Sequence, residues 1–367
     1  MPVEIGLDRM LKKREKTLYR LCKDTGLSYQ QGFAILKKQT TRIDFQTIET
    51  ICDYLDCDTS ELIWIEKKTG RLEDIMKSFP ETNYSKRTSS PNQSKKAKPF
   101  LQWVGGKREM IPQYAKYFPK NYKNYYEPFL GGGAMFFELE PQNAFLNDNN
   151  PELIKTYEGV RDNPYKVISL LRELKSHHSS ELYMKIRSFD RECNIFEELE
   201  PYEIAARMIY LNQTCFNGVY RVNQKGQFNV PIGSSLDRLI CDEATIQKAS
   251  AVLKKAKIES RDFFDSLSNT QRGDFVYLDP PYFPISDYSD FTRYTKEKFY
   301  KEDQERLRDK IDELSKKGVY VMLSNSNCEF IKDLYKNYKI IEVQSSRSLN
   351  CKKEKRGKVS ELLVINY

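Results

Sequence analysis

The chain has 367 residues and a formal net charge of +8, so we expect two or three folded units and a polyanionic partner. Eight widely spaced cysteines without a C-x-x-C pair and only two histidines argue against a disulfide framework or a zinc cluster, and we expect no metal site. The absence of a signal peptide and of a long apolar run predicts a cytoplasmic protein without a membrane contact.

Residues 1–70 predict a small all-α domain. A helix ends at Gly26, which suits a left-handed C-terminal turn, and Ser28 caps the next helix. That second helix carries Gln30 and Gln31, side chains that can contact DNA. In order, length and the position of its glycine, the stretch resembles the helix-turn-helix of phage repressors. A generic helical bundle that makes protein contacts is the alternative.

Residues 71–98 predict a flexible basic linker. From 85 to 98 the chain contains no acidic and no large apolar side chain. Such a segment buries too little surface to offset the entropy of ordering. It marks the boundary to a larger domain at 99–367. Contact with DNA phosphates is an alternative to a plain solvated tether.

Two glycine-rich turns open the larger domain. Residues 103–107 place two glycines and a lysine in a row, and 125–137 predict a strand, a glycine turn and a helix. Such turns let the backbone approach a ligand at a helix N-terminus. The next strand ends at Asp148, where an acid can accept both hydroxyls of a ribose. Because no phosphate-type G-K-[ST] motif occurs, a nucleoside without phosphates is favoured, and S-adenosylmethionine fits.

Residues 151–215 have helical periodicity, and a β-hairpin is predicted after them. Alternating side chains lie on both sides of the predicted turn at 223–226. A hairpin tipped with Arg, Asn and Lys can enter a major groove, where Arg binds two acceptors of guanine. An ordinary surface hairpin is the alternative.

A buried strand at 274–278 leads into Asp279-Pro280-Pro281-Tyr282. An acid at the carboxyl end of such a strand lies where open α/β sheets bind ligands. The prolines lack N–H groups and have fixed φ, so their carbonyls point outward. A carboxylate, a free carbonyl and an aromatic ring can together hold a planar base with an amino group. A strand followed by a Pro-Pro turn is the alternative.

The end of the chain predicts two more strands, at 317–326 and 361–367, the first beside the base pocket. Arg347, Ser348 and the run 352–358 suit phosphate contact, with a solvated loop as the alternative.

From Pro99 onward the chain resembles the Dam-type (D12 class, alpha group) DNA adenine methyltransferases. The matching stretches occur in the family's order: 103–107, 127–133, 147–148, 217–233 and 279–282. The resemblance implies a Rossmann-like doubly wound α/β sheet with a target-recognition insert at about 151–256. It also implies methyl transfer from S-adenosylmethionine to the N6 amine of adenine in double-stranded DNA.

The resemblance further implies a role for each matching residue. The catalytic residues would be Asp279, Pro280 and Tyr282, which accept the amine protons and stack on a base that has left the duplex. The cofactor would contact Trp103, Lys107, Glu127, Phe129, Gly131, Asp148, Asp262, Phe263 and Asp279. The DNA would contact Phe216, Asn217, Tyr220, Arg221, Asn223, Lys225, Asn229 and Pro231.

The expected target contains GATC, or is a longer site that includes GAT. The segment 234–238 departs from the basic, aromatic run typical of the family. Enzymes acting on cytosine, RNA or protein amides are alternatives, but their motifs begin with Ser or Asn where this chain has Asp279. A transcriptional regulator with a vestigial methyltransferase domain is another alternative. The presence of Asp148, Asp279 and Tyr282 argues against it. We also expect a cognate restriction endonuclease as a functional partner, and an N-terminal domain that aids DNA binding or represses a linked gene.

Overall fold

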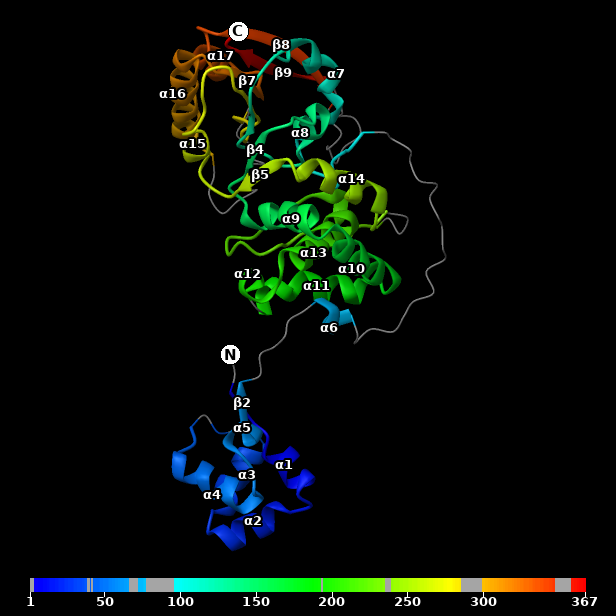
Figure 1. Cartoon of the computed structure of the whole chain (residues 1–367), viewed down its shortest axis with the longest axis vertical. Coiled ribbons are helices and arrows are strands. Elements are labelled where there is room, and N and C mark those ends of the chain that lie inside the picture. Colours follow the sequence, from blue (N-terminus) through cyan, green and yellow to red (C-terminus); the bar gives the residue numbers. More distant parts are fainter. Residues whose placement is uncertain are drawn as a thin grey trace. The chain divides into compact units, whose positions relative to one another are not determined.

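The computed structural model describes residues 3–37, 40, 42–65, 72–76, 96–192, 194–234, 239–284, 299–346 and 358–367. The chain divides into two compact units, Met1–Gly70 and Arg71–Tyr367 (Figure 1). Each unit has its own apolar core, so each is described by itself.

The small unit is a bundle of short helices closed by a two-stranded antiparallel sheet. Gly26 ends α2 with φ 75°, and the Ser28 side chain accepts a hydrogen bond from the Gln31 N–H at the start of α3, as predicted. The strand pair was not predicted, because three-residue strands give no periodic signal. The elements are β1 (Val3–Ile5), α1 (Leu7–Lys13), α2 (Leu18–Thr25), α3 (Tyr29–Leu36), α4 (Phe45–Leu55), α5 (Thr59–Leu62) and β2 (Ile63–Ile65).

The larger unit is built on a seven-stranded sheet in the order β5-β4-β3-β6-β7-β9-β8. β3 to β7 run parallel, and β9 is antiparallel to both of its neighbours. The strands are β3 (Tyr125–Glu127), β4 (Ala144–Asn147), β5 (Ala256–Glu259), β6 (Phe275–Leu278), β7 (Tyr320–Ser326), β8 (Lys339–Ser346) and β9 (Lys358–Ile365). β4 and β5 lie on one side of β3, and β6 and β7 lie on its other side. The strand order therefore reverses between β3 and β6, and open α/β sheets bind ligands at such a reversal.

Apolar side chains fill both faces of this sheet. Along β6, Phe275 and Tyr277 belong to one buried cluster while Val276 and Leu278 belong to another. A strand covered on both faces has a continuous apolar sequence, which explains the run before Asp279. The helical segments beside the sheet are η1 (Lys107–Glu109), α7 (Ile111–Tyr114), η2 (Ala115–Tyr117), α8 (Ala134–Leu139), α15 (Phe263–Ser266), α16 (Lys301–Lys317) and α17 (Glu329–Leu334).

The segment between β4 and β5 is helical, as predicted, and α13 packs along α9 at its centre (Figure 1). Its helices are α9 (Pro151–Asp162), α10 (Pro164–Ser176), α11 (Ser180–Glu192), α12 (Ile195–Glu198), α13 (Pro201–Thr214), η3 (Phe216–Gly218) and α14 (Glu243–Leu253). The predicted hairpin is a looser structure. Among the described residues of this segment, Cys215–Ile232 and Val222–Phe228 form isolated bridges rather than a continuous ladder.

Part of the stretch expected to be a flexible linker belongs to the larger unit. Helix α6 (Leu72–Met76) packs on α10 and α11, and both Leu72 and Met76 are buried. The Leu72 N–H donates to Glu203 Oε1 at 3.2 Å. The expectation of a free tether is therefore wrong for 72–76. It is also wrong for 96–98, where the Ala97 N–H donates to Glu140 Oε1 at 3.0 Å and Lys98 pairs with Asp242 at 3.0 Å. Residues 77–95 lie outside the described residues.

Candidate active site

Asp279 lies at the carboxyl end of β6 in a mostly buried position. Lys107 Nζ is 2.9 Å from its Oδ1, and Ser324 Oγ donates to the same oxygen at 2.8 Å. Burial raises the pKa of the Asp279 carboxyl, and the Lys107 charge opposes this shift. Among the described residues, Oδ2 has no hydrogen-bond partner. The carboxyl thus has one fixed oxygen and one that can accept a ligand hydrogen.

The Asp-Pro-Pro-Tyr segment is held by side chains from α16 and from the C-terminal strands. Gln304 Nε2 donates to the Pro281 carbonyl at 3.0 Å, and Asn325 Nδ2 donates to Gln304 Oε1 at 3.0 Å. The Tyr282 hydroxyl donates to Glu361 Oε2 at 2.7 Å. No described residue donates to the Pro280 carbonyl. The strand that carries Asn325 was expected beside the base pocket, whereas no sequence pattern indicated Gln304, because only the fold brings α16 to the motif.

Lys107 was expected to contact the cofactor. Its side chain is 5% exposed, and besides pairing with Asp279 its Nζ lies 4.7 Å from the centre of the Tyr282 ring. It also donates to the Gly105 carbonyl at 2.5 Å. The structure therefore places this lysine beside the acid and the ring that were expected to hold the target base.

Asp148 and Gly131 come together at the ends of β4 and β3. The Gly131 N–H donates to Asp148 Oδ2 at 2.9 Å, and the Asn150 N–H donates to Oδ1 at 3.0 Å. Burial raises the Asp148 pKa to about 6. Gly131 has φ +46°, and a Cβ there would lie 2.8 Å from Trp103 Cδ1. Only glycine fits this turn, because its φ is positive and Trp103 packs directly against it.

Glu127 ends β3 and is 2% exposed. The Tyr125 hydroxyl donates to its Oε2 at 2.8 Å. Burial raises the Glu127 pKa to about 8, and the charges of Asp279 and Asp148 add to the increase. Three carboxyl groups therefore share one edge of the sheet, and the central one is largely protonated at neutral pH.

Phe129 and Phe263, which were expected to contact the cofactor, lie in a group of aromatic rings. The Phe129 ring centre lies 5.3 Å from that of Phe263 and 5.8 Å from that of Phe299. Arg306 lies over Phe263 at 5.2 Å and pairs with Asp262 at 3.3 Å. Phe299 and Arg306 were missed because nothing near them in the sequence marks a site.

The expected DNA-contacting residues fall into an exposed set and a set that shapes the loop. Phe216 is 48% exposed, and its N–H donates to the carbonyl of exposed Pro231 at 2.9 Å. Arg221 is exposed and donates through Nε to Asn229 Oδ1 at 2.8 Å. Lys225 is exposed at the turn.

Asn217 and Asn223 have conformational roles as well. Asn217 is exposed and adopts φ 55°, a left-handed conformation that asparagine tolerates. Asn223 Oδ1 accepts from the N–H groups of Lys225 and Gln227 at 2.9 and 3.0 Å. This side chain closes the turn, so its oxygen already has partners.

Tyr220 is not on the surface, contrary to its expected place beside the vacated base. It is 5% exposed, its ring stacks on Trp103 at 5.3 Å, and its hydroxyl donates to Glu152 Oε2 at 2.9 Å. The segment turns this side chain inward because two other segments supply an aromatic and a polar partner.

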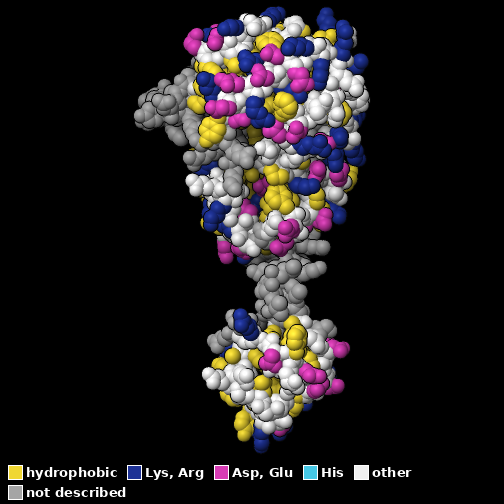
Figure 2. Space-filling model, turned by 90° about the vertical axis from the view of Figure 1, so that its left-hand side faces the viewer, with side chains coloured by type: hydrophobic (Ala, Val, Ile, Leu, Met, Phe, Trp, Pro, Cys, Tyr) yellow, Lys and Arg dark blue, Asp and Glu magenta, His cyan; other side chains and the backbone are white. Residues whose placement is uncertain are grey.

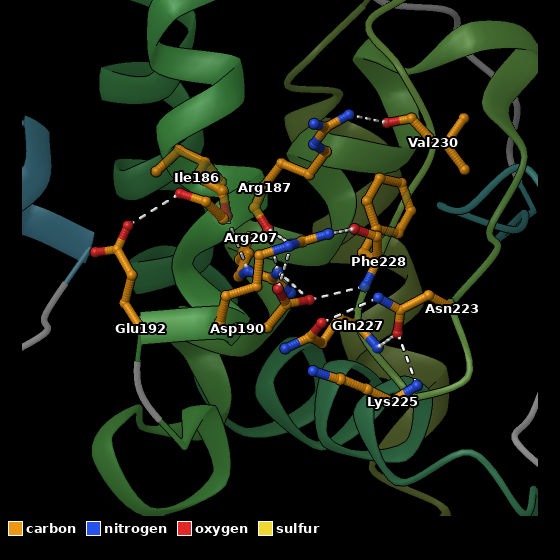
Figure 3. A network of polar contacts seen from close by, with 12 residues as sticks. Ile186, Arg187, Asp190, Glu192, Arg207, Asn223, Lys225, Gln227, Phe228 and Val230 are labelled. Atoms are coloured by element: carbon orange, nitrogen blue, oxygen red, sulfur yellow. Dashed lines mark hydrogen bonds and ion pairs between the residues drawn. The ribbon is translucent and has the colours of Figure 1, made fainter.

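A buried group of charged side chains supports the recognition loop (residues 215–233) (Figure 3). Arg207 on α13 is fully buried, 2.6 Å from Glu152 Oε1 and 2.9 Å from Asp190 Oδ2. Asp190 also accepts the Phe228 N–H at 2.8 Å, and Arg191 donates to the Phe228 carbonyl at 2.7 Å. An arginine within the apolar run 204–211 of this helix was the available sequence signal for this group.

In the small unit, Gln30 and Gln31 are exposed on α3, and Gln31 Oε1 accepts the Ser28 hydroxyl at 2.9 Å. Tyr29 and Phe33 are exposed on the same helix, with ring centres 6.2 Å apart. This helix therefore presents amide and aromatic side chains together.

Residues 103–349 match the family of D12 class N6 adenine-specific DNA methyltransferases. The chain belongs to this family. It is an adenine-specific DNA methyltransferase, as the sequence motifs implied, and residues 6–68 match the Cro/C1-type helix-turn-helix DNA-binding domain. Both units of this D12-class enzyme thus match families of proteins that bind DNA.

Three relatives show how far the similarity extends. The type II methyltransferase M1.LlaDCHI of Lactococcus lactis subsp. cremoris is 45% identical over 272 residues, 74% of this chain and 95% of the relative. M.MjaIII of Methanocaldococcus jannaschii is 39% identical over 289 residues, covering 74% and 99%. The DNA adenine methylase of Haemophilus influenzae is 30% identical over 275 residues, covering 74% and 94%.

The surface of this D12-class enzyme carries both signs of charge. On the face drawn in Figure 2, Lys and Arg side chains alternate with Asp and Glu side chains. The positive net charge is therefore not gathered into a uniform basic surface on that face. Within the described ranges, no helix has the length and apolar character needed to cross a membrane. The phosphate contacts expected at Arg347, Ser348 and 352–357, and residues 235–238, lie outside the described residues.

Proposed function

We propose that this methyltransferase takes its methyl group from S-adenosylmethionine and modifies adenine in double-stranded DNA at a site containing GATC or GAT. The observation that carries the chemistry is the pair of acceptors at Asp279 Oδ2 and the Pro280 carbonyl, which have no donors among the described residues. Two acceptors match the two N–H groups of an adenine amine. Cytosine offers the same amine, and its exclusion rests on the family match.

Three features fit the cofactor. The turn at Gly131 packs its backbone against Trp103, Asp148 lies at the end of β4 and accepts the Gly131 N–H, and Phe129 and Phe263 form an aromatic pair. Asp148 would bind the ribose hydroxyls, and Asp262 with Phe263 would bind the adenine ring. Trp103, Glu127 and Gly131 would surround the methionine part. When bound, the cofactor supplies an electrophilic methyl group.

The protein's own contribution is positioning and electrostatics. Asp279, paired with Lys107, and the Pro280 carbonyl would accept the amine hydrogens and align the nitrogen lone pair with the methyl carbon. Tyr282, fixed by Glu361, would stack on the flipped base. Lys107 over the Tyr282 ring holds both groups in one geometry.

The recognition loop would read the target. Arg221 is exposed and oriented by Asn229, so its guanidinium is available to guanine. Phe216, Asn217 and Pro231 would flank the gap left by the adenine. Asn223 and Lys225 would lie at the turn closest to the groove.

We further propose that the chain is the modification enzyme of a restriction–modification system, acting with a cognate endonuclease in the cytoplasm of a bacterium or a phage-infected cell. The name of the Lactococcus relative as a type II methyltransferase supports this proposal. Gln30 and Gln31 of α3 would add DNA binding or repress a linked gene. Replacing both by Ala should weaken promoter binding and leave methylation at the target intact.

A methylome of host DNA tests the site. Cells that express the wild-type chain should carry N6-methyladenine at one motif containing GAT, and cells that express Asp279→Ala should carry none there. Methylation of adenine in motifs without GAT would refute the proposed site, while cytosine methylation would refute the proposed base.

A further inference from the structure

We propose that helix α11, which lies outside the recognition loop, determines how strictly Arg221 discriminates between bases. The inference rests on the proposed function, in which the Arg221 guanidinium reads a guanine. Side chains of α11 bind the backbone on both sides of Asn229, and Asn229 in turn binds Arg221. These side chains are therefore positioning residues, because they act on the base through Arg221.

Asn229 holds Arg221 at two points. Its Oδ1 accepts the Arg221 Nε–H at 2.8 Å, and its N–H donates to the Arg221 carbonyl at 3.1 Å. A guanidinium bound through Nε still has the hydrogens of its terminal nitrogens to donate, and a bidentate contact with guanine uses two of its hydrogens. Because such a contact requires a particular angle of the guanidinium plane, the position of Asn229 decides how well Arg221 fits one base.

The residue before Asn229 is bound to α11 through both of its backbone groups. The N–H of buried Phe228 donates to Asp190 Oδ2 at 2.8 Å (Figure 3), and its carbonyl accepts from Arg191 Nη2 at 2.7 Å. Asp190 is held in turn by Arg207 of α13, at 2.9 Å. Hydrogen bonds to charged side chains are stronger than those between neutral groups. This peptide segment is therefore tied firmly to the helix.

The residue after Asn229 is bound to the same helix. The Val230 carbonyl accepts the Tyr183 hydroxyl at 2.9 Å and Arg187 Nη1 at 3.3 Å. Val230 and Tyr183 are both buried. Asn229 thus lies between two anchors that come from positions about two turns apart on α11, so its place follows that of the helix.

The recognition loop has little regular structure of its own to hold Asn229. Val222 and Phe228 form an isolated bridge, and near the turn the Asn223 N–H donates to the Gln227 carbonyl at 2.8 Å. A two-stranded hairpin by itself is at best marginally stable. The bonds from α11 therefore supply the precision that base reading needs, and their removal should lower discrimination.

The test compares methyl transfer from S-adenosylmethionine to a set of duplexes by the full chain. One duplex carries the sequence that the wild type methylates, and in each of the others a single G·C pair of that sequence is replaced by A·T. The ratio of kcat/KM for the first duplex to that for a changed one is the discrimination at that position. The guanine read by Arg221 is the one at which Arg221→Ala lowers this ratio.

Arg191→Ala and Tyr183→Phe each remove a donor, on opposite sides of Asn229. Each should lower discrimination at that guanine by about 5-fold, which corresponds to one hydrogen bond, and leave discrimination at the other positions unchanged. In the Arg221→Ala background the same substitutions should change it by less than about 2-fold, because they act through the guanidinium.

Lys185→Ala is the matched control on the same helix. Lys185 is exposed, and its Nζ pairs with Glu192 at 3.5 Å. This variant should keep the wild-type discrimination at every position. Arg191 is 32% exposed, so its replacement leaves the core of the larger unit intact, and thermal unfolding verifies this.

Wild-type discrimination in the folded α11 variants would overturn the proposal. So would an equal loss of transfer to all duplexes, which is the result of a merely structural role, or a loss of discrimination that persists in the Arg221→Ala background. If Arg221→Ala lowers discrimination at no guanine, the proposed reading by Arg221 fails together with this inference. A wild type that methylates no adenine would instead refute the proposed function.

Discussion

At the scale of single residues, the site depends on carboxyl groups whose surroundings differ. Asp279 has Lys107 beside it, Asp148 has backbone N–H donors, and Glu127 accepts the Tyr125 hydroxyl and lies close to the other two carboxyl groups. Burial raises the pKa of all three carboxyl groups, to about 8 for Glu127 and to about 6 for Asp148. A largely neutral Glu127 between the two proposed ligand sites limits the electrostatic repulsion among the three carboxyl groups.

Cofactor binding should depend on pH through Asp148. Its pKa is about 6 in the free protein, and the ribose contact requires the carboxylate. Below pH 6 the affinity for S-adenosylhomocysteine should fall by about tenfold per pH unit, and above it the affinity should be flat. Asp148→Asn should bind more weakly and lose this dependence. Calorimetry between pH 5 and 8 measures both, and a flat wild-type profile would contradict the assignment.

Arg221→Ala should relax discrimination at one guanine of the target by about 1–3 kcal/mol, since the guanidinium would bind two acceptors of that base. Lys225→Ala is the control, because a phosphate contact should weaken all sequences alike. Competition between duplexes with single base changes provides the measurement. Unchanged base preference in Arg221→Ala would remove this residue from recognition.

At the scale of elements, the parallel strands, the capped helices of the small unit and the helical insert followed from local patterns. The apolar run of β6 and the cap at Ser28 are local signals. Contacts between distant segments were not visible in the sequence. The inward turn of Tyr220 depends on Trp103 and Glu152, and the short strands of the small unit depend on their pairing.

The last strand should be indispensable. β9 lies between β7 and β8, its Leu362 and Leu363 are fully buried on opposite faces, and Glu361 fixes Tyr282. Removing residues 361–367 takes most of the partner strand from β8 and exposes one edge of β7, so the larger unit should lose its cooperative thermal transition. Removing Tyr367 alone is the milder control. A truncated protein with an unchanged transition would contradict this view of the sheet.

At the scale of the whole molecule, two units with separate cores carry two DNA-directed activities. Deleting residues 1–70 should leave methylation and the unfolding temperature of the larger unit unchanged while abolishing promoter binding. Deleting residues 1–76 should lower that temperature, because Leu72 and Met76 are buried against the larger unit. Equal temperatures for the two deletions would contradict the assignment of α6.

The most direct test of the central claim is transfer of a tritiated methyl group from S-adenosylmethionine to mixed-sequence duplex DNA. We predict label in adenine with the wild-type chain and a loss of about 1,000-fold in Asp279→Ala, with duplex binding retained. Unlabelled adenines with the wild type, or full transfer by Asp279→Ala, would contradict the proposed site.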